Sequence, residues 1–335
     1  MWLIVAHHYV VQSGLATIIT NSPLRSESWF LYFFGMWGKT GINCFVLITG
    51  YFMCRSTISL RKFLKLLLEV ELYKITIFVL FCLAGRAECS FNNILQTIMP
   101  FRDIDTGFIG GFLMYYLAIP FLNILVDNLD KQRHLLLMAY GIILYSVMQK
   151  FGFLLTLNYV AWFSVLHIVA SYIRLYDLPR NNEMKFWGKA TFCTILLAMM
   201  SVVGVRLLTG GCYWMVSDSN APFAILVAVC SFMFFKNMRL PHSSLINSLA
   251  AGTFAVFLIH NNKLMREWLW HDVFQNCNFW ESSVLIPHAI ISVTVIFIVC
   301  TIIDYIRRKT IERPILDITV KFAMQWLPLK YKKVQ

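Results

Sequence analysis

The sequence predicts an all-α, polytopic integral membrane protein with about ten transmembrane helices. Hydrophobic residues make up 59% of the 335 residues, and only 14% are Asp, Glu, Lys or Arg. The mean hydropathy of +0.66 lies outside the range of ordinary soluble domains. We therefore expect residues 1–313 to form one transmembrane domain, followed by a basic tail over residues 314–335.

Ten apolar segments account for the predicted spans. They cover residues 1–20, 36–54, 63–85, 107–126, 134–150, 158–174, 190–209, 219–236, 246–265 and 284–306. Gly, Asn or Lys interrupts several of them, and 134–150 is the shortest, so nine or eleven spans also fit the pattern.

The distribution of Lys and Arg predicts how the spans are oriented. Twenty of the 29 basic residues follow the even-numbered spans, whereas seven lie in the loops on the other side. Basic residues concentrate in cytoplasmic loops, so both termini are expected in the cytoplasm. The net charge of +12 then reflects membrane topology and not binding to nucleic acid.

The two ends of the chain carry different signals. The tail after Pro314 mixes Trp326 and Tyr331 with several lysines, as expected of a segment lying along the anionic inner leaflet. Met1 instead opens directly onto apolar residues without a basic lead, so we expect about ten further residues upstream in the full protein.

The loops and motifs exclude several kinds of site. Cys89, Cys212 and Cys277 fall in predicted outer loops, where one disulfide among the three is compatible with an oxidising compartment. The sequence contains no C-x-x-C spacing, P-loop, dinucleotide-binding glycine run or H-E-x-x-H. We therefore expect neither a bound metal nor a nucleotide-hydrolysing domain.

Two adjacent histidines, His7 and His8, lie inside the first apolar segment. A polar side chain at that depth marks a relay, an ion path or a catalytic base, or else it bridges helices. Gln12 follows His8 by four residues and shares its helix face, whereas the apolar Val11 follows His7. His8 is thus predicted to face the interior of the bundle.

The second segment carries the strongest local pattern, Gly41-Ile42-Asn43-x-Phe45-x-x-Ile48-Thr49-Gly50-Tyr51, preceded by Lys39. Further patterned runs are Tyr115–Asn123, Gly252–Asn262 followed by Arg266 and Trp270, and Ile311–Pro314. Together with His8 in the first helix, these runs resemble, in order, membrane-bound acyltransferase family 3, the integral-membrane O-acyltransferases of bacterial surface polysaccharides.

The chain departs from that family at two places. The family arginine, ten residues before the first-helix histidine, would fall before Met1. The Trp-Phe that usually precedes the fourth helix is replaced by Phe108-Ile109-Gly110-Gly111, which bears on how an acceptor sugar is held.

The resemblance implies a multi-pass protein of the bacterial inner membrane. Acyl-CoA, most simply acetyl-CoA, is the expected donor, and a glycan or lipid-linked saccharide is the expected acceptor, among membrane lipids and without nucleic acid. His8 is the expected base and His260 a second catalytic residue. Binding roles fall to Lys39 and Asn43 at the oxyanion, Arg61 and Lys65 at the coenzyme A phosphates, and Asn262 and Arg266 at the substrate.

Each of these roles has a simpler alternative. Arg61 and Lys65 also satisfy the positive-inside pattern, Lys39 can extend to the outer interface, and His260 can bridge helices. At the level of function, the alternatives are a transporter or flippase for a lipid-linked sugar or small solute, and a catalytically inactive scaffold. Transfer of labelled acetyl from acetyl-CoA to a glycan distinguishes the first reading from the other two.

Overall fold

The computed structural model describes residues 1–99, 107–153, 158–176, 180–211 and 213–326. All regular secondary structure in these ranges is helical, so the prediction of an all-α fold is confirmed. The first helices are α1 (Trp2–Val11), α2 (Leu15–Asn21), α3 (Ser26–Gly35), α4 (Gly38–Met53), α5 (Leu60–Leu83), α6 (Phe91–Ile98), α7 (Phe108–Asp127) and α8 (Lys131–Ile142). The chain continues with α9 (Tyr159–Leu175), α10 (Met184–Thr209), α11 (Pro222–Lys236), α12 (Ser244–Ala251), α13 (Thr253–His260), α14 (Lys263–Glu267), α15 (Leu285–Thr310) and α16 (Glu312–Trp326).

Membrane-spanning character is clearest in four stretches: Ser26–Met53, Phe108–Asp127, Met184–Thr209 and Leu285–Thr310 are long and apolar enough to cross a bilayer. Two bent pairs raise the number to six if each pair is one span: α1 with α2, bent by 58°, and the Ser244–His260 stretch with Lys263–Phe279, bent by 80°. Each of the ten predicted segments contains helix, while the number of spans and the orientation of the termini stay predictions.

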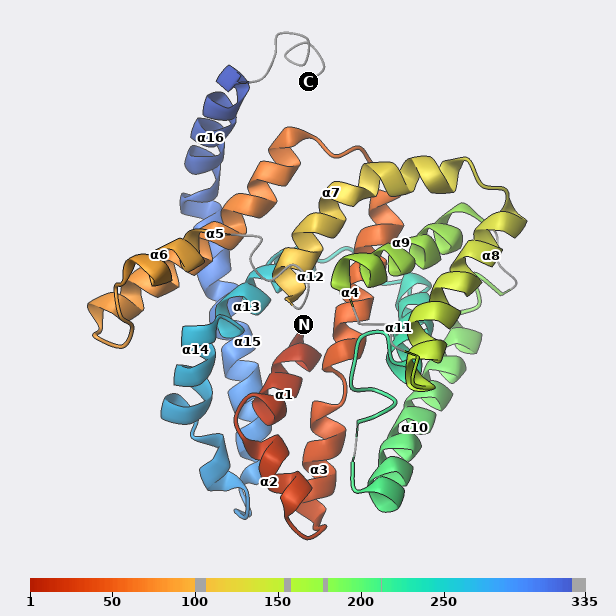
Figure 1. Cartoon of the computed structure of the whole chain (residues 1–335), viewed down its shortest axis with the longest axis vertical. Helices are drawn as coiled ribbons and strands as arrows, with labels where there is room; N and C mark the ends of the chain where they lie inside the picture. Colours follow the sequence, from red (N-terminus) through yellow and green to blue (C-terminus); the bar gives the residue numbers. More distant parts are fainter. Residues whose placement is uncertain (100–106, 154–157, 177–179, 212, 327–335) are drawn as a thin grey trace.

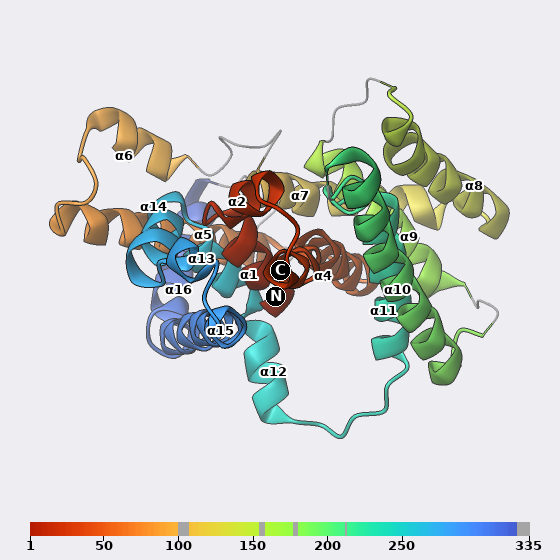
Figure 2. The ribbon, with the colours of Figure 1, turned by 90° about the horizontal axis from the view of Figure 1, so that it is seen from below.

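The helices form two groups with a shared centre (Figures 1 and 2). One group contains α5, α6 and α13 to α16, and the other contains α8 to α11. Between them, α1 packs on α3, α4, α13 and α15, while α4 and α7 pack on α9. The first helix therefore lies in the middle of the molecule, where both groups meet.

The first two predicted spans differ from the helices that form. The chain breaks after α1, where Gly14 takes a φ of +89°, a conformation that favours glycine. The second span begins at Ser26, ten residues before the predicted start, with a turn before Gly38. A Cβ at Gly38 would lie 2.4 Å from Cβ of His7, so only glycine lets α4 approach α1 this closely.

An aromatic cluster fills the space between α4, α7, α9 and α13. The Phe108 ring lies 4.6 Å from that of Phe257, and the Phe45 ring stacks on Phe254 at 5.8 Å. Phe163 of α9 closes the cluster against Phe108 at 5.7 Å. Such pairs add to the free energy of burial and have defined geometry, so they fix the position of α13 relative to α4 and α7.

A buried ionic cluster joins α5, α15 and α16. Arg307 lies 3.2 Å from a carboxylate oxygen of Glu69, 2.8 Å from Asp304 and 3.1 Å from Glu312. Tyr73 donates a hydrogen bond to Asp304 at 2.9 Å. Buried charges need such partners, because desolvation is otherwise very costly. The predicted start of the tail at residue 314 lies within α16, which packs on α5. Residues 327–335 of that tail lie outside the described residues.

Candidate functional site

Two helices that lie far apart in the sequence bring a pair of histidines together. Nδ1 of His8, on α1, lies 2.8 Å from Nε2 of His260, the last residue of α13. His260 is completely buried and His8 is 8% exposed. The structure therefore unites the two residues expected to be catalytic in one buried hydrogen bond.

The hydrogen-bond partners assign the tautomers of the neutral pair. Nδ1 of His260 faces the backbone carbonyl of Val256, which can only accept, so this nitrogen carries the proton. Nε2 of His260 is then an acceptor, and Nδ1 of His8 must be the donor between the rings. Nε2 of His8 keeps its lone pair. Within the described part of the chain it has no hydrogen-bond partner, and it is not one of the fully buried unpaired atoms.

The neighbouring positions separate the two faces of α1. Gln12 donates from Nε2 to Oδ1 of Asn261 at 2.9 Å, so His8 and Gln12 both contact the end of α13, as their four-residue spacing predicts. His7 points elsewhere and donates to the backbone carbonyl of Gly35 at 2.6 Å. The two adjacent imidazoles are thus engaged by different partners.

A cleft of about 860 Å³ adjoins the histidine pair. Phe257 lines it, and the same ring lies 6.1 Å from the His8 ring and 6.0 Å from the His260 ring. Asn262 and Arg266, both expected to bind substrate, also line the cleft. Its other polar lining residues are Lys74, Arg86, Glu88, Asn93, Gln96, Thr97, Asn261 and Lys263.

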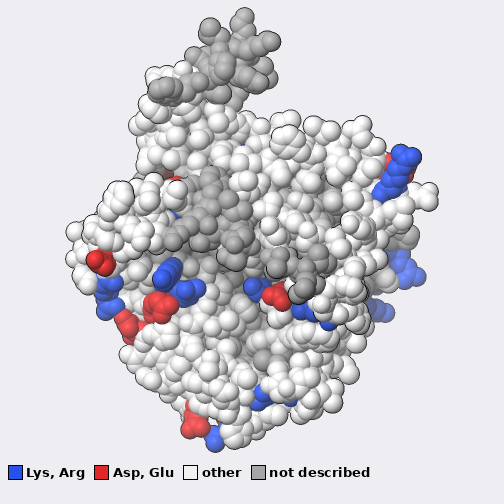
Figure 3. Space-filling view, viewed as in Figure 1, with Lys and Arg blue, Asp and Glu red and all other residues white. Residues whose placement is uncertain are grey.

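Charged groups are unevenly distributed over the face that Figure 3 shows. Most of the face in Figure 3 carries no charged side chain, and acidic and basic groups gather where α6 and α14 lie in Figure 1. The cleft, whose lining includes residues of α6 and α14, therefore lies in a region where charged and polar groups gather.

The structure turns Lys39 and Asn43 toward α9. Lys39 donates to the hydroxyl of Tyr159 at 3.4 Å. Asn43 is fully buried; it donates to the backbone carbonyl of Ser219 at 2.6 Å and accepts from Nε1 of Trp162 at 3.1 Å. The oxygen and one N–H of the Asn43 amide thus brace α4 against α9 and the segment before α11, so the expected donation to an oxyanion would fall to the second N–H.

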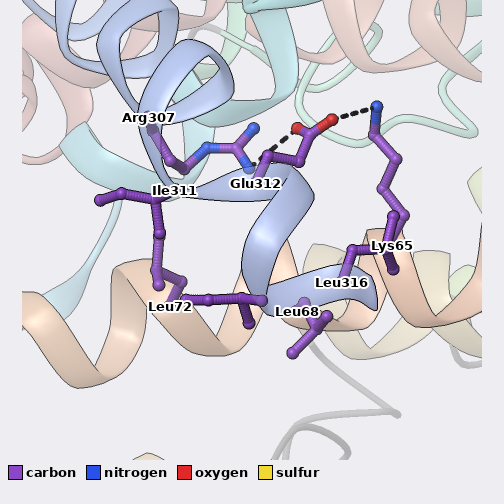
Figure 4. Close-up of a pocket in the computed structure, with 8 residues that line it drawn as sticks. Lys65, Leu68, Leu72, Arg307, Ile311, Glu312 and Leu316 are labelled. Atoms are coloured by element: carbon purple, nitrogen blue, oxygen red, sulfur yellow. Dashed lines mark hydrogen bonds and ion pairs between the residues drawn. The ribbon is translucent and has the colours of Figure 1, made fainter. Parts of the chain in front are cut away.

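Arg61 and Lys65 lie at the contact between α5 and α16, away from the histidine pair. Arg61 forms an ion pair with Asp317 at 2.6 Å, and Lys65 forms one with Glu312 at 2.6 Å. Figure 4 shows the Glu312 carboxylate between Lys65 and Arg307. All three side chains line a pocket of about 20 Å³. Both cations expected at the coenzyme A phosphates thus hold carboxylates of this chain.

Sequence reasoning missed several residues of the site. Asn261 partners Gln12, and Lys74, Arg86 and Lys263 line the cleft. A signal was present, because the amphipathic segment 91–98 and the basic residues beside it do not suit a plain outer loop. The polar side of that segment supplies Asn93 and other amide groups of the cleft.

Metal and disulfide sites are not found in the described ranges. No group of three or more His, Cys, Asp or Glu side chains there is arranged to hold a metal ion. Cys89 and Cys277 are both unpaired, and Cys277 donates to the backbone carbonyl of Ser13 at 2.9 Å. Cys212, the third cysteine of the predicted outer loops, lies outside the described residues.

The site gives this chain a hydrogen-bonded pair of neutral imidazoles with one nitrogen free, beside a polar cleft of ligand size. Such an arrangement can remove a proton from a hydroxyl group and return it to a leaving group. Comparison of the chain with protein-family models, with curated proteins and with solved structures finds no match.

Proposed function

We propose that this chain is a membrane O-acyltransferase that transfers an acyl group, acetyl in the simplest case, from acyl-CoA to a hydroxyl of a cell-surface or lipid-linked saccharide. The observation that carries the proposal is the hydrogen bond between His8 and His260 beside the polar cleft. A sugar hydroxyl is a poor nucleophile at neutral pH and needs a positioned base. The free Nε2 of His8 supplies that base, and the motif resemblance favours the same reaction.

In the proposed reaction, the acceptor oxygen attacks the thioester carbonyl while its proton passes to Nε2 of His8. The tetrahedral intermediate then collapses, the carbon–sulfur bond breaks, and the departing sulfur takes the proton from Nε2. His260 is a positioning residue, because accepting from Nδ1 keeps the reactive nitrogen of His8 free and stabilises the imidazolium. In this proposal Lys39 supplies positive charge to the developing oxyanion, the role that the motif resemblance implies for it.

The surroundings support acyl transfer in two further ways. The histidine pair is buried, which limits water and protects a thioester from hydrolysis. Asn262 and Arg266 line the cleft, and their amide and guanidinium groups suit the hydroxyls and ring oxygens of a saccharide. The bacterial inner membrane is the proposed location, where acyl-CoA and a growing glycan occupy opposite faces.

A transporter or flippase for a lipid-linked sugar or small solute is the second candidate. The observation in its favour is that both bent helix pairs, α1 with α2 and Ser244–His260 with Lys263–Phe279, adjoin the site. Secondary transporters often build binding sites from such interrupted helices.

The test is transfer of labelled acetyl by the purified full-length protein in liposomes, with acetyl-CoA and polysaccharide from the native membrane. His8→Ala should lower the rate by roughly 10²–10⁴, the usual contribution of a general base. His7→Ala is the matched control and should cost less than about tenfold, because it removes the same imidazole from the adjacent position. Sugar movement across the vesicle without acetyl transfer would instead identify a transporter, and equal losses in the two variants would remove the base role from His8.

A further inference from the structure

The cleft beside the histidine pair has the size and lining of a small-molecule site. Its volume of about 860 Å³ lies in the range of ordinary ligand pockets. Its walls come from α5, the loop between α5 and α6, α6, the start of α7, and the stretch from α13 into α14. Asn93, Gln96, Thr97 and Asn262 line it, so it offers both donors and acceptors to a ligand.

Cationic groups outnumber acidic ones in that lining. Among the described residues, Lys74, Arg86, Lys263 and Arg266 line the cleft, against the carboxylate of Glu88. The other carboxylates that pair with these cations are not part of the lining: Glu71 lies 3.4 Å from Lys74, Asp272 pairs with Arg86, and Glu267 lies 3.9 Å from Arg266.

Two of the cations have unused hydrogen-bond donors. At 3.9 Å, the contact between Arg266 and Glu267 is an ion pair beyond hydrogen-bond length. Lys263 has no polar partner in the part of the chain that the structure describes. Three residues apart on α14, the two side chains share one helix face, and both line the cleft.

Membrane topology does not explain these charges. Arg86, Lys263 and Arg266 belong to the seven basic residues predicted on the outer side, where the positive-inside pattern disfavours them. Three of those seven nevertheless line a single cleft. Their concentration there requires another reason, and a ligand of opposite charge supplies one.

We infer that this cleft binds an anionic group, a phosphate or a carboxylate, carried by the acceptor saccharide, with Lys263 and Arg266 as its principal donors. The identity of that saccharide as the acceptor rests on the proposed function. The guanidinium of Arg266 can hold two oxygens of one anion in parallel, and Lys263 adds a second positive charge. Phe257 also lines the cleft, and its ring lies 6.1 Å from the His8 ring, so a saccharide anchored here lies near the proposed base.

Binding to the full-length protein in nanodiscs of neutral lipid tests the inference without requiring acyl transfer. The probes are glucose 1-phosphate, glucuronate, inorganic phosphate and glucose, followed by isothermal titration calorimetry. We expect at least one of the two anionic sugars to bind more tightly than both glucose and inorganic phosphate, and the preferred sugar shows whether the anion is a phosphate or a carboxylate.

Two variants and a control locate the binding. Lys263→Gln and Arg266→Gln should each weaken binding of the preferred sugar by about tenfold or more, as loss of a charge-assisted hydrogen bond implies. Lys185→Gln removes the same charge from an exposed position at the start of α10 and should leave binding unchanged. Equal binding of glucose, no binding of any anionic sugar, or unchanged affinity in both cleft variants would overturn the inference. Labelled-acetyl transfer in the same preparation reports separately on the proposed function.

Discussion

Replacing His260 tests whether this residue controls the tautomer of its partner. His260→Leu removes the only acceptor for Nδ1–H of His8 within the described residues, at a contact of 2.8 Å where one residue is fully buried and the other 8% exposed. A buried donor left without a partner costs about 1–3 kcal/mol. His8 can avoid that cost by moving its proton to Nε2, which removes the lone pair needed for catalysis.

The magnitude follows from that cost. A difference of about 1–3 kcal/mol corresponds to roughly 5- to 150-fold in population, so kcat of His260→Leu should fall by a factor in that range. His260→Gln offers an amide oxygen as acceptor and should recover most of the loss. The KM for acetyl-CoA should stay within about twofold of the wild-type value in both variants, since neither substitution changes a residue expected to bind the acyl donor.

The assay is labelled-acetyl transfer at saturating acetyl-CoA, with size-exclusion profiles of each variant in detergent as the check on folding. The decisive comparison is between His260→Leu and His260→Gln. Both variants lack the imidazole, and only His260→Gln offers an oxygen that can accept the hydrogen bond from His8. Full activity of His260→Leu, or equal impairment of both well-folded variants, would refute the tautomer argument.

Three further perturbations have defined outcomes. Arg307→Met should lower the free energy of unfolding in chemical denaturation by about 3–5 kcal/mol, because the buried carboxylates of Glu69 and Asp304 lose their partner. As a control, Arg25→Ala removes an exposed ion pair and should cost less than about 1 kcal/mol. Gly38→Ala should lower the melting temperature, at a cost of about 1–3 kcal/mol of stability, because the added methyl group meets His7. Adding His7→Ala should restore part of the lost stability. A double variant no more stable than Gly38→Ala would contradict the close approach of Gly38 to His7. Arg61→Ala should raise the KM for acetyl-CoA about tenfold if its guanidinium exchanges Asp317 for a donor phosphate, and an unchanged KM would leave Arg61 as a structural contact.

Local patterns predicted the parts of this molecule that depend on local spacing. Composition predicted the all-α class, and the four-residue interval between His8 and Gln12 predicted their common face. Lys39 and Asn43 are also four residues apart and so share a helix face. The interval did not indicate that this face contacts α9, because that depends on how the helices pack. Spacing defines a helix face, whereas tertiary packing decides what that face contacts.

The spacing of residues along the sequence could not predict contacts between distant segments. His8 and His260 are 252 residues apart, and only the motif resemblance placed them in one site. The carboxylates of Glu312 and Asp317 hold Lys65 and Arg61 because α16 packs on α5, a contact that no periodicity in either segment encodes. The close approach of Gly38 on α4 to His7 on α1 is another contact between separate helices that sequence spacing does not encode.

The ionic cluster around Arg307 has a consequence for biogenesis. Asp304 and Arg307 lie three residues apart on α15 and can neutralise each other as soon as that helix forms. Glu69 is synthesised much earlier, on α5, and its cationic partner arrives only near the end of translation. Until then its carboxylate is either exposed to water or protonated, because an unpaired buried charge is too costly. A ribosome-bound chain that has not yet produced α15 therefore leaves Glu69 of α5 without the guanidinium of Arg307 as its partner.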